Sequence, residues 1–233
     1  MREYAFSGEG SRISMQVEVK TKFFKPRQLV VPHEVALDFL VTGLVLGSCG
    51  RGRWPTGTVP ALAFSDSAYP EHIDYDLMTG GGIITLEAAT VSGRPRPFRA
   101  VLVGEDVEPE ESSPVEGLRC GVLGFGSTTV LAGTSCNVNV SPARPFRGER
   151  LVVPSTVAGD FQVENIMIGR AEPRYQMSGG PVPGTCFAES VPKFGPHGLA
   201  LDKCAPEEHM TICIRNLTDV DKSFTAAMFG RYE

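Results

Sequence analysis

The chain has 233 residues, a formal net charge of −5 and a pI near 5.5. An acidic chain of this kind lacks the basic surface that binding to nucleic-acid phosphates requires, so we expect no specific nucleic-acid recognition. Its 42% hydrophobic and 21% charged residues are typical of a soluble globular protein. The 26 glycines and 18 prolines indicate many turns and short strands, which favours a β architecture.

The first 14 residues are polar and contain glycine, and we predict an arm or an edge segment there. They lack the apolar core of a secretory signal, so we expect no secretion by a signal peptide. The longest nearly apolar run spans residues 35–47 and contains Asp38. This run is shorter than the roughly 20 residues that a membrane-spanning helix needs, which predicts no membrane span.

The central feature of the sequence is an internal duplication. Residues 24–47 align without a gap to residues 146–169 and agree at eleven of 24 positions. Two further pairs of segments match, 59–64 with 182–187 and 98–104 with 224–230. The offset grows from 122 to 123 and then to 126, which places small insertions in the gaps. Because surface loops tolerate insertions at little cost in free energy, the matched segments are the framework of a duplicated domain.

The first elements of each copy follow from alternation and from proline. Apolar and polar residues alternate over residues 15–21 and again over 136–141, which predicts a half-buried strand in each copy. A second strand ends at the proline of the Leu-Val-Val-Pro stretch, Pro32 or Pro154, because proline donates no hydrogen bond to a sheet. A short turn or one helical turn is expected to follow.

The clearest predicted strands are residues 39–47 and 161–169. In the second of these, the apolar positions change parity at Glu164-Asn165, which predicts a β-bulge, with Gly43 near the matching position of the first copy. The other matched strands are expected at residues 83–88, 98–104, 210–216 and 224–230. The glycine-punctuated run that begins at Cys120 can open the second copy with one more strand, or form a flexible domain connection.

No stretch keeps apolar residues at helical spacing for long enough to form a major helix, and six to eight short strands are expected per copy. The predicted fold is therefore all-β, with two tandem duplicated antiparallel β-sandwich domains of a jelly-roll-like type. We expect the first sandwich with its N-terminal arm over residues 1–107, a linker over 108–120 and the second sandwich over 121–233.

The common signatures of catalytic sites are missing from the sequence. The four histidines are scattered and form neither H-x-H nor H-E-x-x-H, and no G-x-S-x-G nucleophile elbow occurs. We therefore predict that the protein is not an enzyme and that it holds no metal and no cofactor. The sequon that begins at Asn216 fits a turn after a strand, and we assign no glycan to it.

The six cysteines include no C-x-x-C pair, and we interpret them first as thiols in a reducing compartment. A Cys120–Cys136 disulfide is the alternative, which the spacing leaves open.

The loops differ in chemistry between the two copies, and we look for partners there. Arg51, Arg53 and Trp54 form a basic-aromatic cluster, which we interpret as a protein contact because Arg and Trp favour protein interfaces. Stacking on a nucleic-acid base is the other use of such a cluster, and the negative net charge disfavours it. The candidate interface residues are Arg51, Arg53, Trp54, Tyr69, His72, Tyr175 and Met177.

Two similar sandwiches without a catalytic constellation are typical of a building block. The duplication is carried by the paired framework at residues 29–32 and 151–154 and by the closing strands that begin at Phe98 and Phe224. In this architecture the chain resembles the double jelly-roll major capsid proteins of icosahedral viruses and their phage relatives. The resemblance implies a self-assembling virion shell subunit that forms pseudo-hexameric trimers, because three chains present six similar domains in a ring.

On this interpretation the partners are copies of the chain itself, in a homotrimer or a larger shell, with other virion proteins as further candidates. The expected location is the virion, assembled in the host cytoplasm. The alternative is a two-domain β-sandwich binding module for a carbohydrate or a protein partner, which would use Trp54, Tyr69 and Tyr175. Formation of regular multimers distinguishes the first function from the second.

Overall fold

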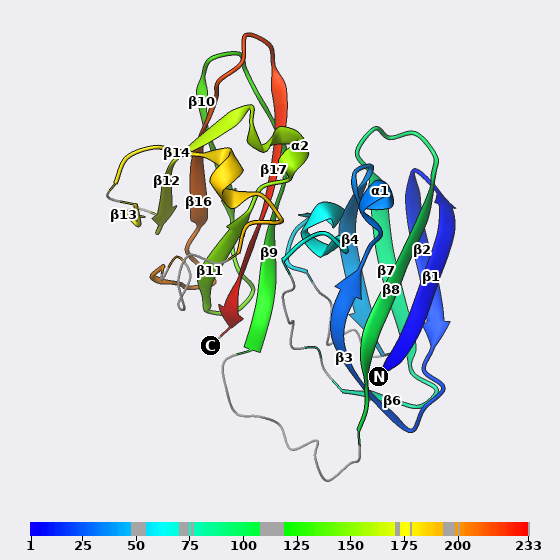
Figure 1. The fold of residues 1–233 in the computed structure, drawn as a ribbon. Helices are drawn as coiled ribbons and strands as arrows, with labels where there is room; N and C mark the ends of the chain where they lie inside the picture. Colours follow the sequence, from blue (N-terminus) through cyan, green and yellow to red (C-terminus); the bar gives the residue numbers. More distant parts are fainter. Residues whose placement is uncertain are drawn as a thin grey trace.

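The computed structural model describes residues 1–47, 55–69, 75, 77–107, 119–170, 173–177, 179–192, 199 and 201–232. Within these residues the chain consists mainly of β-strands joined by turns (Figure 1). The helical segments described there are single turns: α1 (His33–Ala36), η1 (Ala61–Phe64), α2 (Ser155–Ala158) and η3 (Gly184–Phe187). None of the described helices is long and apolar enough to cross a membrane.

The first copy forms two four-stranded antiparallel sheets. Its strands are β1 (Arg2–Gly10), β2 (Arg12–Glu18), β3 (Phe23–Val30), β4 (Phe39–Leu46), β5 (Val59–Pro60), β6 (Met78–Thr79), β7 (Ile83–Thr90) and β8 (Arg96–Asp106). One sheet has the order β1-β8-β3-β6 and the other has the order β2-β7-β4-β5. Phe39 and Phe98, one from each sheet, pack edge to face between them with ring centroids 4.8 Å apart.

The second copy repeats this arrangement. Its strands are β9 (Arg119–Val130), β10 (Ser135–Val140), β11 (Phe146–Val152), β12 (Phe161–Ile168), β13 (Arg174–Tyr175), β14 (Val182–Pro183), β15 (Lys203–Cys204), β16 (Met210–Asn216) and β17 (Lys222–Tyr232). The sheets have the orders β15-β11-β17-β9 and β10-β16-β12-β13, with β14 also paired to β12. Phe161 and Phe224 repeat the ring pair of the first copy, with centroids 5.1 Å apart.

The strand pairs are nested like those of one long hairpin. In the first copy β1 pairs with β8, β2 with β7, β3 with β6 and β4 with β5. In the second copy β9 pairs with β17, β10 with β16, β11 with β15, and β12 with both β13 and β14. Such a hairpin, rolled up so that its strand pairs lie alternately in two facing sheets, is a jelly roll. The predicted all-β fold of two tandem antiparallel sandwiches is confirmed, and the topology of each is a jelly roll.

The duplicated stretch forms the framework of both rolls. Leu29 and Val31 are buried in the first core, and Leu151 and Val153 are buried in the second. The strand ends at Val30 or Val152, and the proline that follows Val31 or Val153 precedes a single helical turn, as the sequence predicts. The bulges are confirmed as well: the register shifts between Val41 and Gly43 in β4 and between Val163 and Asn165 in β12.

Some expectations are wrong in detail. The N-terminal residues do not form an arm, because β1 pairs with β8 along its whole length, from Arg2 opposite Gly104 to Gly10 opposite Arg96. The alternative of an edge segment is confirmed, since β1 lies at the edge of its sheet. The next strand begins at Arg12, earlier than predicted, and the described part of the second copy has nine strands where at most eight were expected.

Cys136 is a free thiol, so the alternative Cys120–Cys136 disulfide does not form. Of the predicted linker, residues 108–118 lie outside the described residues, and β9 begins at Arg119. The expected domain bounds remain a prediction.

Candidate functional site

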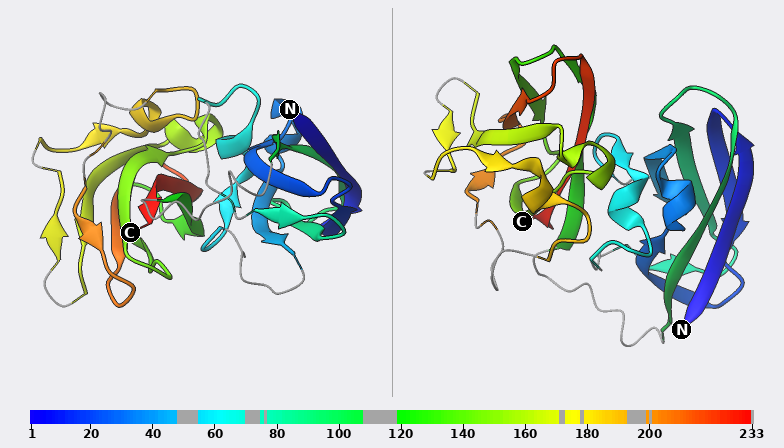
Figure 2. Two further views of the ribbon diagram at one scale, coloured as in Figure 1. Left: turned by 90° about the horizontal axis from the view of Figure 1, so that it is seen from below. Right: turned by 45° about the horizontal axis from the view of Figure 1, so that its top comes forward.

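The two rolls lie side by side with their long strands running in nearly the same direction, as Figures 1 and 2 show. The β15-β11-β17-β9 sheet of the second roll lies between the two cores. On β17, Ala226 and Met228 belong to the core of the second roll, whereas Ala227 and Phe229 belong to the core of the first. Side chains of a strand alternate between its two faces. This sheet is therefore buried on both faces, and it is the structural centre of the molecule.

The face of this sheet that points toward the first roll is covered by β5 and by Phe64 of η1. The Phe64 ring of η1 meets the Phe229 ring of β17 edge to face, with centroids 6.0 Å apart. Val59 and Leu62 on the covering segment are buried, as is Val122 on β9. Burial of apolar side chains on both sides holds the two rolls together as one packed body.

A short piece of the first roll also adds to the edge of this sheet. Thr56 forms a parallel β-bridge with Leu123 of β9. The backbone N–H of Gly124 donates to the Thr56 carbonyl at 2.8 Å, and the N–H of Gly126 donates to the Thr58 carbonyl at 3.1 Å. Glycine in a strand often marks the close approach of another backbone. The glycine-punctuated run is therefore part of β9 and a docking edge, and the interpretation as a flexible connection is wrong.

Gly57 in this piece requires glycine for two reasons. Its φ is +83°, in the left-handed region that favours glycine. A Cβ added there would lie 2.2 Å from the carbonyl oxygen of Gly124. The contact between the rolls is therefore close and backbone to backbone.

Arg150 of β11 closes the contact on the other side. Its buried guanidinium donates to the carbonyls of Glu189 at 2.6 Å, Val191 at 3.0 Å and Tyr69 at 3.3 Å. It also lies over the Tyr69 ring, 5.2 Å from the centroid. The Tyr69 N–H in turn donates to the Glu189 carbonyl at 2.9 Å. Tyr69, predicted as an interface residue, thus belongs to the contact between the two rolls.

The other predicted interface residues do not gather around Tyr69. Tyr175 lies on β13, on the side of the second roll that faces away from the first (Figure 1), and its side chain is 69% exposed. Met177 packs against the second core, and its backbone N–H and carbonyl pair with the Asn165 side chain. The remaining candidates lie outside the described residues: Arg51, Arg53, Trp54 and His72. The seven predicted residues therefore remain a prediction as a single site.

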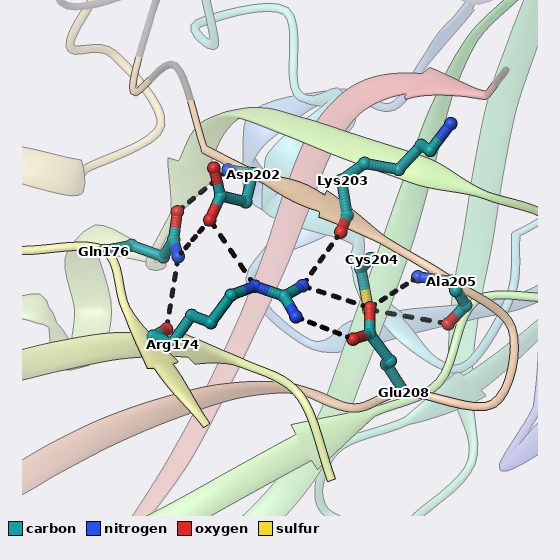
Figure 3. A network of polar contacts seen from close by, with 7 residues as sticks. All are labelled: Arg174, Gln176, Asp202, Lys203, Cys204, Ala205 and Glu208. Carbon is teal, nitrogen blue, oxygen red and sulfur yellow. Dashed lines mark hydrogen bonds and ion pairs between the residues drawn. The ribbon is translucent and has the colours of Figure 1, made fainter. Parts of the chain in front are cut away.

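A network of polar contacts surrounds Arg174 beside Tyr175 (Figure 3). The guanidinium lies between two carboxylates, 3.0 Å from Glu208 and 3.5 Å from Asp202. The Gln176 side chain donates to the Asp202 carboxylate at 3.2 Å and accepts from the backbone N–H of Asp202 at 2.8 Å. The hydrogen bond from Arg174 lowers the pKa of Glu208, and the same hydrogen bond raises the pKa of Arg174. Mutual pairing of this kind ties β13 to the β15 segment.

Two serine–histidine pairs are the described contacts that most nearly resemble catalytic chemistry. Ser67 Oγ lies 2.8 Å from His33 Nδ1, and Ser141 Oγ lies 2.7 Å from His209 Nδ1. In a catalytic triad the second ring nitrogen meets a carboxylate. In the part of the chain that the structure describes, no hydrogen bond joins a carboxylate to either ring. These pairs therefore connect loops to neighbouring segments.

A hollow of about 520 Å³ lies over β2, β4 and β7. Its lining residues are Arg12, Ile13, Ser14, Leu40, Thr42, Thr58, Glu87, Ala88 and Ala89. None of these has the aromatic ring on which the carbohydrate alternative depends. Among the described residues, no group of three or more His, Cys, Asp or Glu side chains is close enough to hold a metal ion.

No family model and no curated protein sequence matches the chain. Solved structures do match. One is a chain from the atomic structure of Sulfolobus Turreted Icosahedral Virus, with 12% identity, a TM-score of 0.48, and 100% of this chain and 91% of that chain covered. Another is the major capsid protein P2 from Bacteriophage PM2, with 8% identity, a TM-score of 0.37, and coverage of 100% and 98%.

A plant complex of the peptide RALF23 with FER and LLG2 matches as well, at 8% identity and a TM-score of 0.31, with coverage of 97% and 82%. A viral major capsid protein is thus among the structures that the chain is similar to, as the sequence resemblance predicts. At these TM-scores the likeness carries no argument beyond that. The strand pairing of the chain itself establishes the double jelly roll.

Sequence reasoning missed the residues that join the two rolls, above all Arg150, Gly57 and Phe229. Two signals in the duplicated pattern point to them. Arg150 takes the place of Gln28 directly before the matched Leu-Val-Val-Pro stretch, and glycines recur within β9. Both departures are explained by the contact between the rolls.

Proposed function

We propose that the chain is a self-assembling shell subunit, a virion capsid protein whose trimers form pseudo-hexameric capsomers. The observation that supports this most is the doubly buried β15-β11-β17-β9 sheet, which joins two jelly rolls side by side into one body. Three such bodies around a threefold axis place six similar rolls in a ring. A ring of six similar units tiles a closed shell.

The finer parts of the proposal follow from this arrangement. The domain bounds we propose are residues 1–107, a linker over 108–120 and residues 121–233. The partners are further copies of the chain, and the location is the virion after assembly in the host cytoplasm. The proposed role is structural, with no reaction and no cofactor.

Size-exclusion chromatography with light scattering, followed by negative-stain imaging, tests the proposal directly. We expect trimers or larger regular particles whose fraction rises with protein concentration. Salt between about 50 and 500 mM should change that fraction little if apolar contacts dominate, because salt screens exposed charges most strongly. A strictly monomeric profile at every concentration and salt would contradict the proposal.

The exposure of Tyr175 favours one competing function, a binding module for a carbohydrate or a protein partner. An exposed aromatic ring beside the satisfied Arg174 network is a rigid surface for stacking. A glycan array and a pull-down distinguish the two functions. One saturable ligand that is lost in Tyr175→Ala, without any particle formation, would favour the binding module.

A further inference from the structure

The contact between the two rolls has a covering side on the first roll and a receiving side on the second roll. Each of these surfaces has a counterpart in the other roll that takes no part in the contact. On the covering side, residues 56–60 correspond to residues 179–183 in the duplicated pattern. The counterparts have the same local structure. Gly57 and Gly180 both have positive φ, +83° and +87°, and β5 pairs with β4 as β14 pairs with β12.

Burial differs sharply between these counterparts. In the first roll Pro60 and Leu62, on the segment that covers the second roll, are buried. Their counterparts in the second roll, Pro183 and Thr185, are exposed. The second roll therefore presents a copy of the covering edge that is left exposed at Pro183 and Thr185.

The receiving side shows the same asymmetry. Val152, Ala227 and Phe229 are buried beneath the first roll. Their counterparts on the β1-β8-β3 sheet are Val30, Val101 and Val103, and all three are partly exposed. These three valines share the outer face of that sheet, because Val30 pairs with Val101 in register just as Val152 pairs with Ala227.

An ion pair borders this apolar face, because Arg27 lies 3.2 Å from Glu105, which is on the same face of β8 as Val101 and Val103. An apolar centre with a polar rim is the usual anatomy of a protein interface. The edge strand of the sheet is β1, as β9 is the edge strand of the sheet that receives residues 56–58.

We propose that the edge formed by residues 179–185 of one chain docks on the outer face of the β1-β8-β3 sheet of the next chain, repeating the contact between the two rolls. The partner is a second copy of this chain, and the inference rests on the proposed function as a shell subunit. Such a head-to-tail contact uses different surfaces on the two copies, and it closes into a ring when the rotation allows. Three chains then alternate internal and external contacts of the same kind around the ring.

The backbone offers the acceptors that the external contact needs. In the internal contact the acceptors are the carbonyls of Thr56 and Thr58. Gly179 and Pro181 stand at these positions in the second roll, and each has a carbonyl oxygen that can accept from a backbone N–H of β1. This is addition of an extended segment to the edge of a sheet.

The two contacts are similar without being identical. Ala5 on β1 takes the place of Gly124 on β9, by the register of each strand with its neighbour. A Cβ at Gly124 would lie 2.3 Å from the Thr58 carbonyl oxygen. The docked segment of the next chain must therefore lie further from β1 than residues 56–58 lie from β9.

Cysteine cross-linking tests where the chains touch. The double variant Ala5→Cys, Pro181→Cys is oxidised and compared with each single variant and with the mismatched pair Ala5→Cys, Tyr175→Cys. We expect covalent dimers and trimers from the matched pair at several times the yield of the controls. Light scattering is measured in parallel. Assembly without extra cross-linking overturns this contact and leaves the shell function standing, whereas a monomer at all concentrations overturns both.

Charge substitutions provide an independent readout. Val101→Asp places a charge on the receiving face, and Thr185→Lys places one on the exposed covering edge. Each should raise the concentration for half-assembly at least tenfold, while Val91→Asp, at an exposed turn, should leave it unchanged. Because Thr185 is exposed, Thr185→Lys keeps its fold even if Val101→Asp does not. Unchanged assembly in folded Thr185→Lys would overturn the proposal.

Discussion

At the scale of single residues, equivalent positions of the duplicated pattern have different roles in the two rolls. Arg150 and Gln28 occupy equivalent places after the bulge of β11 or β3. Only Arg150 faces another roll, and there its guanidinium donates to the carbonyls of Tyr69, Glu189 and Val191. A buried arginine is tolerated because its donors are satisfied in this way.

Replacement of Arg150 should therefore weaken the whole chain. We expect Arg150→Ala to lower the free energy of unfolding by about 2–3 kcal/mol, since it removes charge-assisted hydrogen bonds at the contact between the rolls. Urea denaturation measures this loss. Gln28→Ala is the matched control, with an expected change within about 0.5 kcal/mol. Equal losses in the two variants would show that the contact between the rolls does not depend on Arg150.

Cys204 provides a prediction for alkaline pH. Burial, and then the neighbouring Glu208 carboxylate, raises the pKa of its thiol to about 11 from an ordinary 9.0. Because the folded pKa lies above the unfolded one, the neutral thiol contributes stability that is fully present below pH 9.0 and is lost as the pH rises toward about 11. Native Cys204 should thus react slowly with iodoacetamide at pH 9.

Alkylation followed by peptide mass mapping checks this expectation. The native protein is compared with the same protein in urea, where the thiol should react at least several times faster. The Cys204→Ala variant should lose less stability than the parent between pH 9 and 11. Equal alkylation rates in native and unfolded protein would contradict the assigned burial.

At the scale of elements, the segment at residues 56–58 acts as an extra strand on β9. Its approach depends on Gly57, which combines a positive φ with close contact to the Gly124 carbonyl. The segment is held at two acceptors, the carbonyls of Thr56 and Thr58. The other roll therefore holds this element in place through its backbone.

Comparison of Gly57→Ala with a control variant separates the strain of a positive φ from the clash between the rolls. The control is Gly93→Ala, where φ is +70° and a Cβ would meet nothing within 4 Å. Gly93→Ala should cost about 1 kcal/mol from strain alone. Gly57→Ala should cost at least about 1 kcal/mol more, because the Gly124 backbone has to move. Thermal denaturation of both variants measures the difference, and equal midpoints would mean that the rolls separate easily.

At the scale of the whole molecule, the doubly buried sheet couples the two rolls. The first hydrophobic core contains residues from both copies, including Ala227 and Phe229 of β17. Domains that share a core in this way unfold together, whereas domains with a separate core each unfold independently. We therefore expect the full chain to unfold in a single transition.

Phe229→Ala should break that coupling. The substitution removes the ring that meets Phe64 and should cost about 3–5 kcal/mol. Differential scanning calorimetry should then resolve two transitions in place of one. Phe39→Ala, inside the first roll, is the control and should lower the midpoint while keeping a single transition. Two transitions in the unmodified protein would show that the rolls are independent.

Much of each roll could be predicted because the relevant signals are local. Alternation, the prolines after the Leu-Val-Val stretch and the change of parity at Glu164-Asn165 all act over a few residues, and the structure has the expected strands, turns and bulges there. The role of Asn216 was missed despite its sequon. Its buried side chain donates to the Val130, Leu131 and Val220 carbonyls, which holds a turn together. A sequon does not reveal these partners, because Val130 and Leu131 lie far from Asn216 in the sequence.

The sequence by itself determined that the chain is a duplicated all-β protein, because repetition and period-2 alternation are properties of the chain alone. Only the tertiary structure decided how the strands nest and which sheet lies between two cores. Val30 and Val152 are the same residue at the same place in the pattern, yet Val30 is partly exposed and Val152 is fully buried. The physical reason is that burial depends on what packs on a face, and only the second roll has another roll packed there.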